Sequence, residues 1–143
     1  MNWTLEVITV PVTDLDRAKD FYAGKCGFAL DLDQEVAPGV RIIQLTPPGS
    51  RCSICLIEGM PPFPGTGLTA PGALHGLQLC VTDIEAARER LLTAGVHVSP
   101  VMHVGATGWE AGKGAAWNSF MSFQDPDGNG WMVQEAPSEL AER

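Results

Sequence analysis

Histidine and carboxylate side chains near a glycine-rich segment could move protons in this 143-residue chain. His103 stands just before that segment, and Glu110 lies within it. A histidine and a carboxylate that both reach a ligand can act as general acid and general base. The spacing alone does not show that the two side chains meet, and a solvated loop would carry the same residues. The sequence leaves both interpretations open.

Two of the four cysteines have the spacing of a metal or redox pair. Cys52 and Cys55 are three residues apart, but they lie in an apolar run that favours a β-strand, where such residues point to opposite faces. Cys26 and Cys80 are isolated, so no second pair is available to complete a zinc site. We therefore interpret the cysteines as small, buried, apolar residues.

Aromatic side chains form another group with a possible function, through stacking on a ligand. Trp109 lies in the glycine-rich segment and Trp117 follows it closely. Large flat side chains at such positions can stack on a planar molecule. The alternative is that the aromatic residues fill a core or a dimer interface. The same two interpretations apply to Trp3, Phe120, Phe123 and Trp131.

Composition excludes several classes of partner. The net charge is −8, and no cluster of lysine and arginine occurs, so binding to nucleic acid or to an anionic membrane surface is not expected. No apolar stretch approaches the roughly 18 residues of a membrane-spanning helix, and the first residues do not resemble a signal peptide. We expect a cytoplasmic protein with a small-molecule ligand.

The elements that would position these residues occur twice along the chain. Val12-Thr13-Asp14 returns as Val81-Thr82-Asp83, each after an apolar strand and before a helix-like run. Thr46-Pro47-Pro48-Gly49-Ser50 is echoed by Asp125-Pro126-Asp127-Gly128-Asn129. Two copies are too few for a solenoid, so we predict two β-α-β-β-β modules of an α+β fold. Their expected bounds are 1–59 and 74–136, with a Pro/Gly-rich linker over 60–73 and a polar tail over 137–143.

Propensity and turn residues place the individual elements. In the first module, strands are expected over 3–12, 28–33, 39–46 and 51–59, with a helix after Asp14. In the second, strands are expected over 75–82, 96–102, 116–124 and 130–135, with a helix over 83–94. The glycine-rich segment 104–115 is interpreted as a long loop, either a lid over a binding site or a surface excursion.

The two motifs resemble those of the vicinal oxygen chelate superfamily, which includes glyoxalase I, bleomycin resistance proteins and extradiol dioxygenases. Val12–Tyr22 is similar to the opening of these proteins, and Ser122–Trp131 is similar to their closing signature. The resemblance implies an eight-stranded, cup-shaped mixed sheet around a small-molecule site, and commonly a homodimer. The Asp-Pro-Asp-Gly segment itself is interpreted as a tight turn.

The resemblance also implies a divalent metal, which requires ligands at defined positions. The histidine positions of the family correspond to Val7 and Gly76, and the glutamate positions correspond to Ser53 and Met132. None of these four is a good ligand for such metals, whereas a catalytic site needs about three. We therefore expect no metal cofactor, and we expect the four positions to line the pocket together with Trp109 and Trp117.

An alternative uses displaced ligands. Glu6 and His75 each stand one residue before the expected histidine positions, and Glu135 stands three residues after Met132. A β-bulge at each place could turn these side chains into the site and restore binding of Ni, Fe or Zn. The simpler interpretation is that all three point outward from strands.

Two functions follow from these alternatives. The first is a protein that binds or sequesters an aromatic or otherwise apolar metabolite without chemistry, as resemblance to bleomycin resistance proteins implies. The second is an enzyme, either a metal-dependent, glyoxalase-I-like lyase or dioxygenase, or a metal-free enzyme that uses acid–base residues.

Overall fold

The computed structural model describes residues 1–138, so most of the expected tail over 137–143 lies outside the described residues. Tertiary contacts divide the chain into two compact units. Unit 1 comprises residues 1–74 together with 125–129, and unit 2 comprises residues 75–124 together with those from 130 onward. Within the described part of the chain, no helix is long and apolar enough to cross a membrane.

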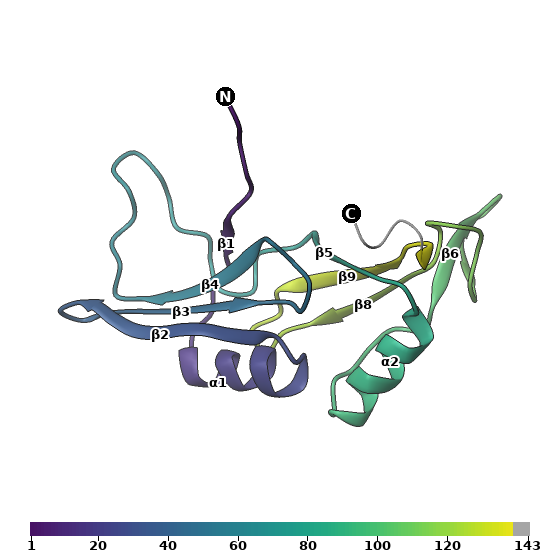
Figure 1. Cartoon of the computed structure of the whole chain (residues 1–143), viewed down its shortest axis with the longest axis horizontal. Helices are drawn as coiled ribbons and strands as arrows, with labels where there is room; N and C mark the ends of the chain where they lie inside the picture. The colour runs from purple at the N-terminus through teal and green to yellow at the C-terminus, as the bar shows by residue number, and fades with distance from the viewer. Residues whose placement is uncertain (139–143) are drawn as a thin grey trace. The chain divides into compact units, whose positions relative to one another are not determined.

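Unit 1 contains a four-stranded mixed sheet in the order β1-β4-β3-β2 (Figure 1). Strand β1 pairs in parallel with β4, and the other neighbours are antiparallel. The sheet therefore has two free edges and is open. The strands are β1 (Val7–Thr9), β2 (Ala29–Ala37), β3 (Val40–Thr46) and β4 (Ser53–Glu58).

One face of this sheet packs against the first helix, α1 (Leu15–Lys19), as Figure 1 shows. Alternate residues in the second half of β3 are buried, because side chains along a strand alternate between its faces, whereas the first four residues of β4 are all buried. The large apolar core residues of the two strands are Ile43, Leu45, Ile54 and Leu56.

The first helix begins where the sequence predicts it and then widens. Asp14 caps the helix by accepting a hydrogen bond from the Arg17 amide (3.0 Å), which satisfies one of the unpaired N–H groups at a helix start. The last turns form a π-helix over Asp20–Lys25, in which the Cys26 N–H donates to the Phe21 carbonyl (2.9 Å). Phe21 and Tyr22 are both buried there, so two consecutive residues contribute to the core.

The Asp-Pro-Asp-Gly turn belongs to unit 1, although it connects two strands of unit 2. The buried Asp125 carboxylate accepts hydrogen bonds from the Tyr22 hydroxyl (2.7 Å) and from the side-chain and backbone N–H groups of Asn129 (2.8 and 2.9 Å). Asn129 also donates to the Pro11 carbonyl (2.7 Å). Asp127 accepts from the Thr13 hydroxyl (2.6 Å). The motif therefore forms a buried polar network as well as a turn.

Unit 2 contains a five-stranded mixed sheet in the order β5-β9-β8-β6-β7. The second helix, α2 (Ile84–Thr93), packs against β8 and β9 (Figure 1). Asp83 caps this helix as Asp14 caps α1, by accepting from the Ala86 amide (3.0 Å). The strands are β5 (Leu77–Val81), β6 (Met102–Gly105), β7 (Gly108–Ala111), β8 (Phe120–Gln124) and β9 (Gly130–Glu135).

The predicted α+β fold is confirmed, with mixed sheets of four and five strands in place of one eight-stranded sheet. The strand expected over 96–102 is reduced to an isolated bridge at Val98 and the first residue of β6. The segment 104–115, for which the sequence predicts an irregular loop, contributes to a β-hairpin made of β6 and β7. The described residues therefore form nine strands instead of eight. The hairpin turn is short, and Gly108, the first residue of β7, has φ 113°, a conformation that glycine adopts without steric cost.

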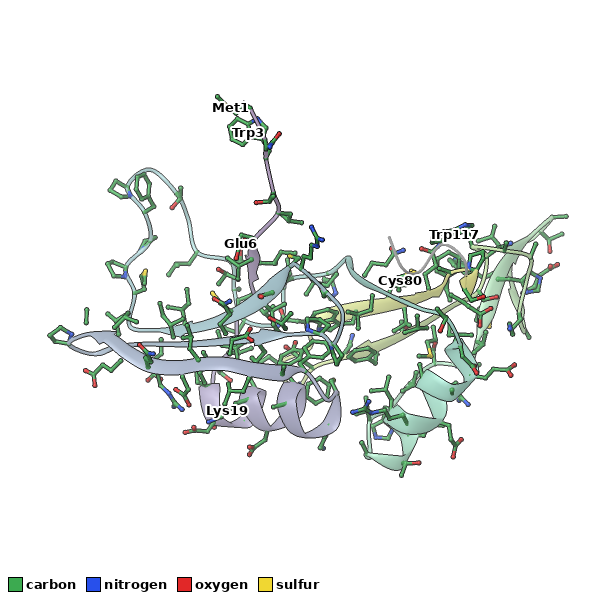
Figure 2. All side chains as sticks on the ribbon, in the orientation of Figure 1. Met1, Trp3, Glu6, Lys19, Cys80 and Trp117 are labelled. Atoms are coloured by element: carbon green, nitrogen blue, oxygen red, sulfur yellow. The ribbon has the colours of Figure 1, made fainter. Side chains whose placement is uncertain are left out.

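The first strand is shorter than expected. Only Val7–Thr9 pair with β4, because β4 begins at Ser53, opposite Val7. Residues before Val7 form an extended arm that leaves the sheet (Figure 1), and Figure 2 shows Met1 and Trp3 at its far end. Trp3 is 87% exposed, so it does not contribute to a core within this chain.

Candidate functional site

The most distinctive surface in unit 2 is the face of its sheet opposite α2, which we call the open face. Side chains alternate across β5, β8 and β9, so Leu77, Met121 and Trp131 are buried on the helix side. Their neighbours point the other way and are exposed or half-buried. The open face consists of Gln78, Cys80, Phe120, Ser122, Met132 and Gln134.

None of the six side chains of the open face is charged. The face combines half-buried aromatic and methionine side chains with the polar groups of two glutamines and a serine. The strand pairing places Gln78, Met132 and Ser122 in one row across three strands. The arrangement suits a ligand that is mostly apolar and makes a few hydrogen bonds.

Trp109 extends this aromatic surface from the hairpin. Its ring meets Phe120 edge to face, with 5.4 Å between the ring centroids and an interplanar angle of 89°. Trp109 remains 54% exposed, so much of the indole can contact a partner. By contrast, Trp131 and Phe123 stack on each other on the buried side. Of the two interpretations that the sequence allowed for them, they fill the core.

The structure brings His103 and Glu110 together, which the sequence left open. They are cross-strand partners in the hairpin, with 3.2 Å between His103 Nε2 and a Glu110 carboxylate oxygen. His103 Nδ1 lies 2.9 Å from the Gly112 carbonyl. Both ring nitrogens thus lie within reach of an oxygen acceptor. The pair ties together the two strands of the hairpin that carries Trp109.

Asn118 fixes the same hairpin from outside. Its side-chain amide accepts from the Val104 N–H (2.8 Å) and donates to the Val104 carbonyl (2.9 Å). The Asn118 side chain thus satisfies both backbone polar groups of Val104, as the backbone of a neighbouring β-strand would. Asn118 could not be identified from the sequence, because nothing there indicates that it reaches the edge of β6.

The sequence repeat suggested that the four positions where the family implies metal ligands would pair in the same way in both units, Val7 with Ser53 and Gly76 with Met132. The strand pairing differs between the units. Val7 lies opposite Ser53 in unit 1, whereas Met132 lies opposite Gln78 in unit 2, two residues beyond Gly76. The reason is that the stretch from the turn glycine to the strand, counted from Gly49 to Ile54 and from Gly128 to Trp131, is two residues longer in the first copy.

By strand pairing, the counterpart of Met132 is therefore Cys55, which lies opposite Thr9. Thr9 and Gln78 hold the same place, three residues before the Val-Thr-Asp motif. The corrected set is Thr9, Cys55, Gln78 and Met132, and it contains no histidine or carboxylate. Cys55 is the one strong metal donor among these four side chains, so the set falls short of the about three ligands that a catalytic metal site needs.

Ser53 belongs to a chain of hydroxyl groups in unit 1. Its Oγ lies 2.6 Å from the Thr46 hydroxyl, and Thr46 donates to the Asp31 carboxylate. Because Thr46 has a single hydroxyl proton and gives it to Asp31, Ser53 must donate to Thr46. Ser53 is only 5% exposed, so this chain stabilises the sheet and leaves little of Ser53 accessible to a ligand.

The displaced ligands do not come together as a metal site either. Glu135 accepts from the Ile84 N–H (3.0 Å) at the start of α2 and pairs with Lys113 (3.0 Å); the hydrogen bond to Glu135 raises the pKa of Lys113. Glu135 is therefore not an outward-facing strand residue but a structural one. Glu6 lies on the arm before β1 (Figure 2), and His75 lies before β5, against Gly130.

Across residues 1–138, no group of three or more histidine, cysteine, aspartate and glutamate side chains is placed to hold a metal ion. The side chains at the positions implied by the family thus do not fit a divalent metal.

A concave surface lies in unit 1 at the end of the β2–β3 hairpin. This open groove has a volume of about 380 Å³ and is lined by Asp33, Gln34, Glu35, Gly39, Arg41 and Glu58. Arg41 donates twice to Asp33 (2.9 Å each), and Glu35 accepts from the Gly39 N–H (2.8 Å). Several of its polar groups are therefore already engaged in holding the hairpin.

The ion pairs at this groove make stability depend on pH. Arg41 and Lys19 hold the pKa of Asp33 well below its ordinary value of 3.8. A lowered folded-state pKa stabilises the fold above the unfolded value, and the contribution is lost as pH falls below about 4. Asp33→Asn should therefore cost about 1 kcal/mol of unfolding free energy at pH 7, and progressively less in acid.

Urea denaturation of the wild type and Asp33→Asn at pH 7 and pH 3 measures this prediction. Glu89→Gln, at an exposed position of α2, is the control for removing one negative charge. A cost for Asp33→Asn that is equal at both pH values would contradict the assignment.

Comparison with known proteins agrees with the fold. The family model described as Glyoxalase/Bleomycin resistance protein/Dioxygenase superfamily matches residues 4–133. The chain therefore belongs to this superfamily. A search of curated proteins returned no match.

Several solved structures are similar over nearly their whole length. TnmS3, described as an antibiotic binding protein from Streptomyces sp. CB03234, is 32% identical with a TM-score of 0.72, over 94% of this chain and 97% of that one. A glyoxalase/bleomycin resistance protein from the same organism is 34% identical with a TM-score of 0.69, over 92% and 99%. A superfamily member from Sphaerobacter thermophilus DSM 20745 is 27% identical with a TM-score of 0.70, over 94% and 98%.

Proposed function

We propose that this protein binds and sequesters an aromatic or otherwise apolar small molecule of the antibiotic type, without chemical conversion. The observation that carries the proposal is the uncharged open face of unit 2, extended by the exposed indole of Trp109. Aromatic side chains offer a large contact area with little loss of conformational freedom. We place Trp109, Trp117 and Met132 in contact with the ligand.

The comparison with TnmS3 supports this proposal, since that protein is described as antibiotic-binding and is 32% identical over 94% of this chain. The donor set supports it as well. The positions where the family implies metal ligands hold side chains that bind such metals poorly, so these residues do not support a metal-dependent lyase or dioxygenase step. No observation favours the enzymatic alternative over binding.

Trp109→Ala should weaken ligand binding by at least tenfold, because truncation removes most of one wall of the aromatic surface. Titration calorimetry with a panel of polycyclic aromatic antibiotics measures the affinity, and chromatography of the mixture after incubation shows whether the antibiotic is unchanged. Leu92→Ala truncates an exposed apolar side chain on α2 and is expected to leave the affinity unchanged. Chemical conversion of the antibiotic, or equal affinity of Trp109→Ala and wild type, would count against the proposal.

We also propose that the protein is a homodimer. Large apolar side chains on the arm and on the linker are exposed in the single chain, among them Leu5, Phe63 and Leu68, and apolar groups of this kind commonly mark association surfaces. Light scattering after size-exclusion chromatography is expected to give twice the chain mass of 15.2 kDa. The mass of one chain over the micromolar range would refute the homodimer.

A further inference from the structure

Two glutamines of the open face form a directional chain of hydrogen bonds. Gln134 Nε2 lies 2.7 Å from the Trp117 carbonyl oxygen, and Gln78 Nε2 lies 2.7 Å from Gln134 Oε1. The chain runs from the edge strand β5 through β9 to the segment before β8. It therefore crosses the surface to which the proposed function assigns the ligand.

The orientation of both amides follows from chemistry. A backbone carbonyl can only accept a hydrogen bond, so the Gln134 amide must turn its nitrogen toward Trp117. Gln134 Oε1 then faces Gln78, which must present its nitrogen in turn. The outer end of the chain is Gln78 Oε1, and no hydrogen bond from the described residues reaches this oxygen. An otherwise rotatable amide is thus held with its acceptor outward.

The inner end of the chain depends on a strained residue. Trp117 has φ 66° and is the one non-glycine residue in the described chain with a positive φ. A bulky residue adopts this conformation only where the surrounding structure imposes it, and such strain is concentrated at functional sites. Here the conformation places the Trp117 carbonyl against Gln134.

We propose that this chain makes the open face selective for planar aromatic ligands that carry a hydrogen-bond donor, such as a phenolic hydroxyl, over the same ring system without one. The donor would bond to Gln78 Oε1 while the ring contacts the aromatic surface of Trp109 and Phe120. A ligand lacking the donor would bury Gln78 Oε1 without a partner, which is costly. The proposal rests on the proposed function, and it adds the chemical class of the ligand.

Daidzein and its dimethyl ether are suitable probes, because they share one aromatic scaffold, with a planar bicyclic chromone, and differ in hydroxyl donors. Titration calorimetry of the wild type is expected to give about tenfold tighter binding of daidzein, the value of one satisfied hydrogen bond. Equal affinity for both probes would overturn the selectivity and leave the proposed function intact. Binding of neither probe would count against aromatic binding itself, and the selectivity would fall with it.

Gln134→Leu separates the hydrogen-bond chain from general packing. Without Gln134, the amide of Gln78 can rotate and offer its N–H groups to the ether, so the preference should fall to about two- or threefold. This should come mainly from tighter binding of the ether, a change that damage to the fold would not produce. Gln78→Leu should reduce the preference by weakening daidzein instead. Gln34→Leu, on β2 of unit 1, is the matched control and should keep the wild-type ratio.

Trp117→Gly tests whether the backbone carbonyl or the indole matters. Glycine adopts a positive φ without strain and keeps the carbonyl, so the tenfold preference should persist even where the absolute affinities change. A wild-type ratio in Gln134→Leu would overturn the proposal. A ratio lost in Trp117→Gly but kept in Gln134→Leu would overturn it as well, and would assign the selectivity to the indole.

Discussion

Replacing Asp125 by alanine is expected to lower the free energy of unfolding by about 3–4 kcal/mol. Asp125 is 5% exposed and accepts hydrogen bonds from the Tyr22 hydroxyl, from Asn129 twice and from the Asp127 N–H. Alanine leaves all these donors without their acceptor in a buried place, and each unsatisfied donor costs about 1–3 kcal/mol unless water enters. The melting temperature should fall by roughly 10 °C.

Urea denaturation followed by circular dichroism measures this effect. Tyr22→Phe removes a single donor of the same network, so it should cost only about 1–2 kcal/mol. Asp20→Ala removes an aspartate of the same unit that lies outside the network and should change the stability by less than about 0.5 kcal/mol. A cost for Asp125→Ala no larger than that of Asp20→Ala would show that the network does not stabilise unit 1.

The fold could be predicted from the sequence because two local signals recur in both copies. Asp14 and Asp83 each follow Val-Thr and cap a helix, and the structure confirms both caps. The Asp-Pro-Asp-Gly motif predicts a turn from the preferences of its residues alone. Helix caps and tight turns depend on residues that are adjacent in the chain, so they can be recognised from one sequence.

The candidate site could be predicted only in part, because its contacts join residues from different strands. The type and position of Trp109 indicate a ligand contact, but its packing on Phe120 depends on a hairpin that the glycine content of 104–115 concealed. The different strand pairing of the two copies, Val7 with Ser53 but Gln78 with Met132, depends on two extra residues after the turn in the first copy. Neither the hairpin nor the register has a local signature.

The Pro/Gly-rich linker illustrates the same limit, because glycines that look alike in sequence differ in what surrounds them. Gly65 and Gly72 have nearly the same positive φ, 84° and 80°. A Cβ on Gly65 would meet nothing within 4 Å, whereas one on Gly72 would lie 2.1 Å from the Asp127 carbonyl oxygen. The linker therefore crosses the Asp-Pro-Asp-Gly turn at a position where only glycine fits.

Gly72→Ala should accordingly destabilise the protein by about 3 kcal/mol or more. Roughly 1–2 kcal/mol comes from the left-handed conformation of alanine, and the remainder comes from moving two backbones apart. Gly65→Ala is the matched control and should cost only about 1–2 kcal/mol, because it carries the conformational cost without the clash. Urea denaturation of both variants gives the difference, which isolates the close approach of Gly72 to Asp127. If both variants lost the same unfolding free energy, the linker could move away from the turn without cost. The close approach of Gly72 to Asp127 would then not stabilise unit 1.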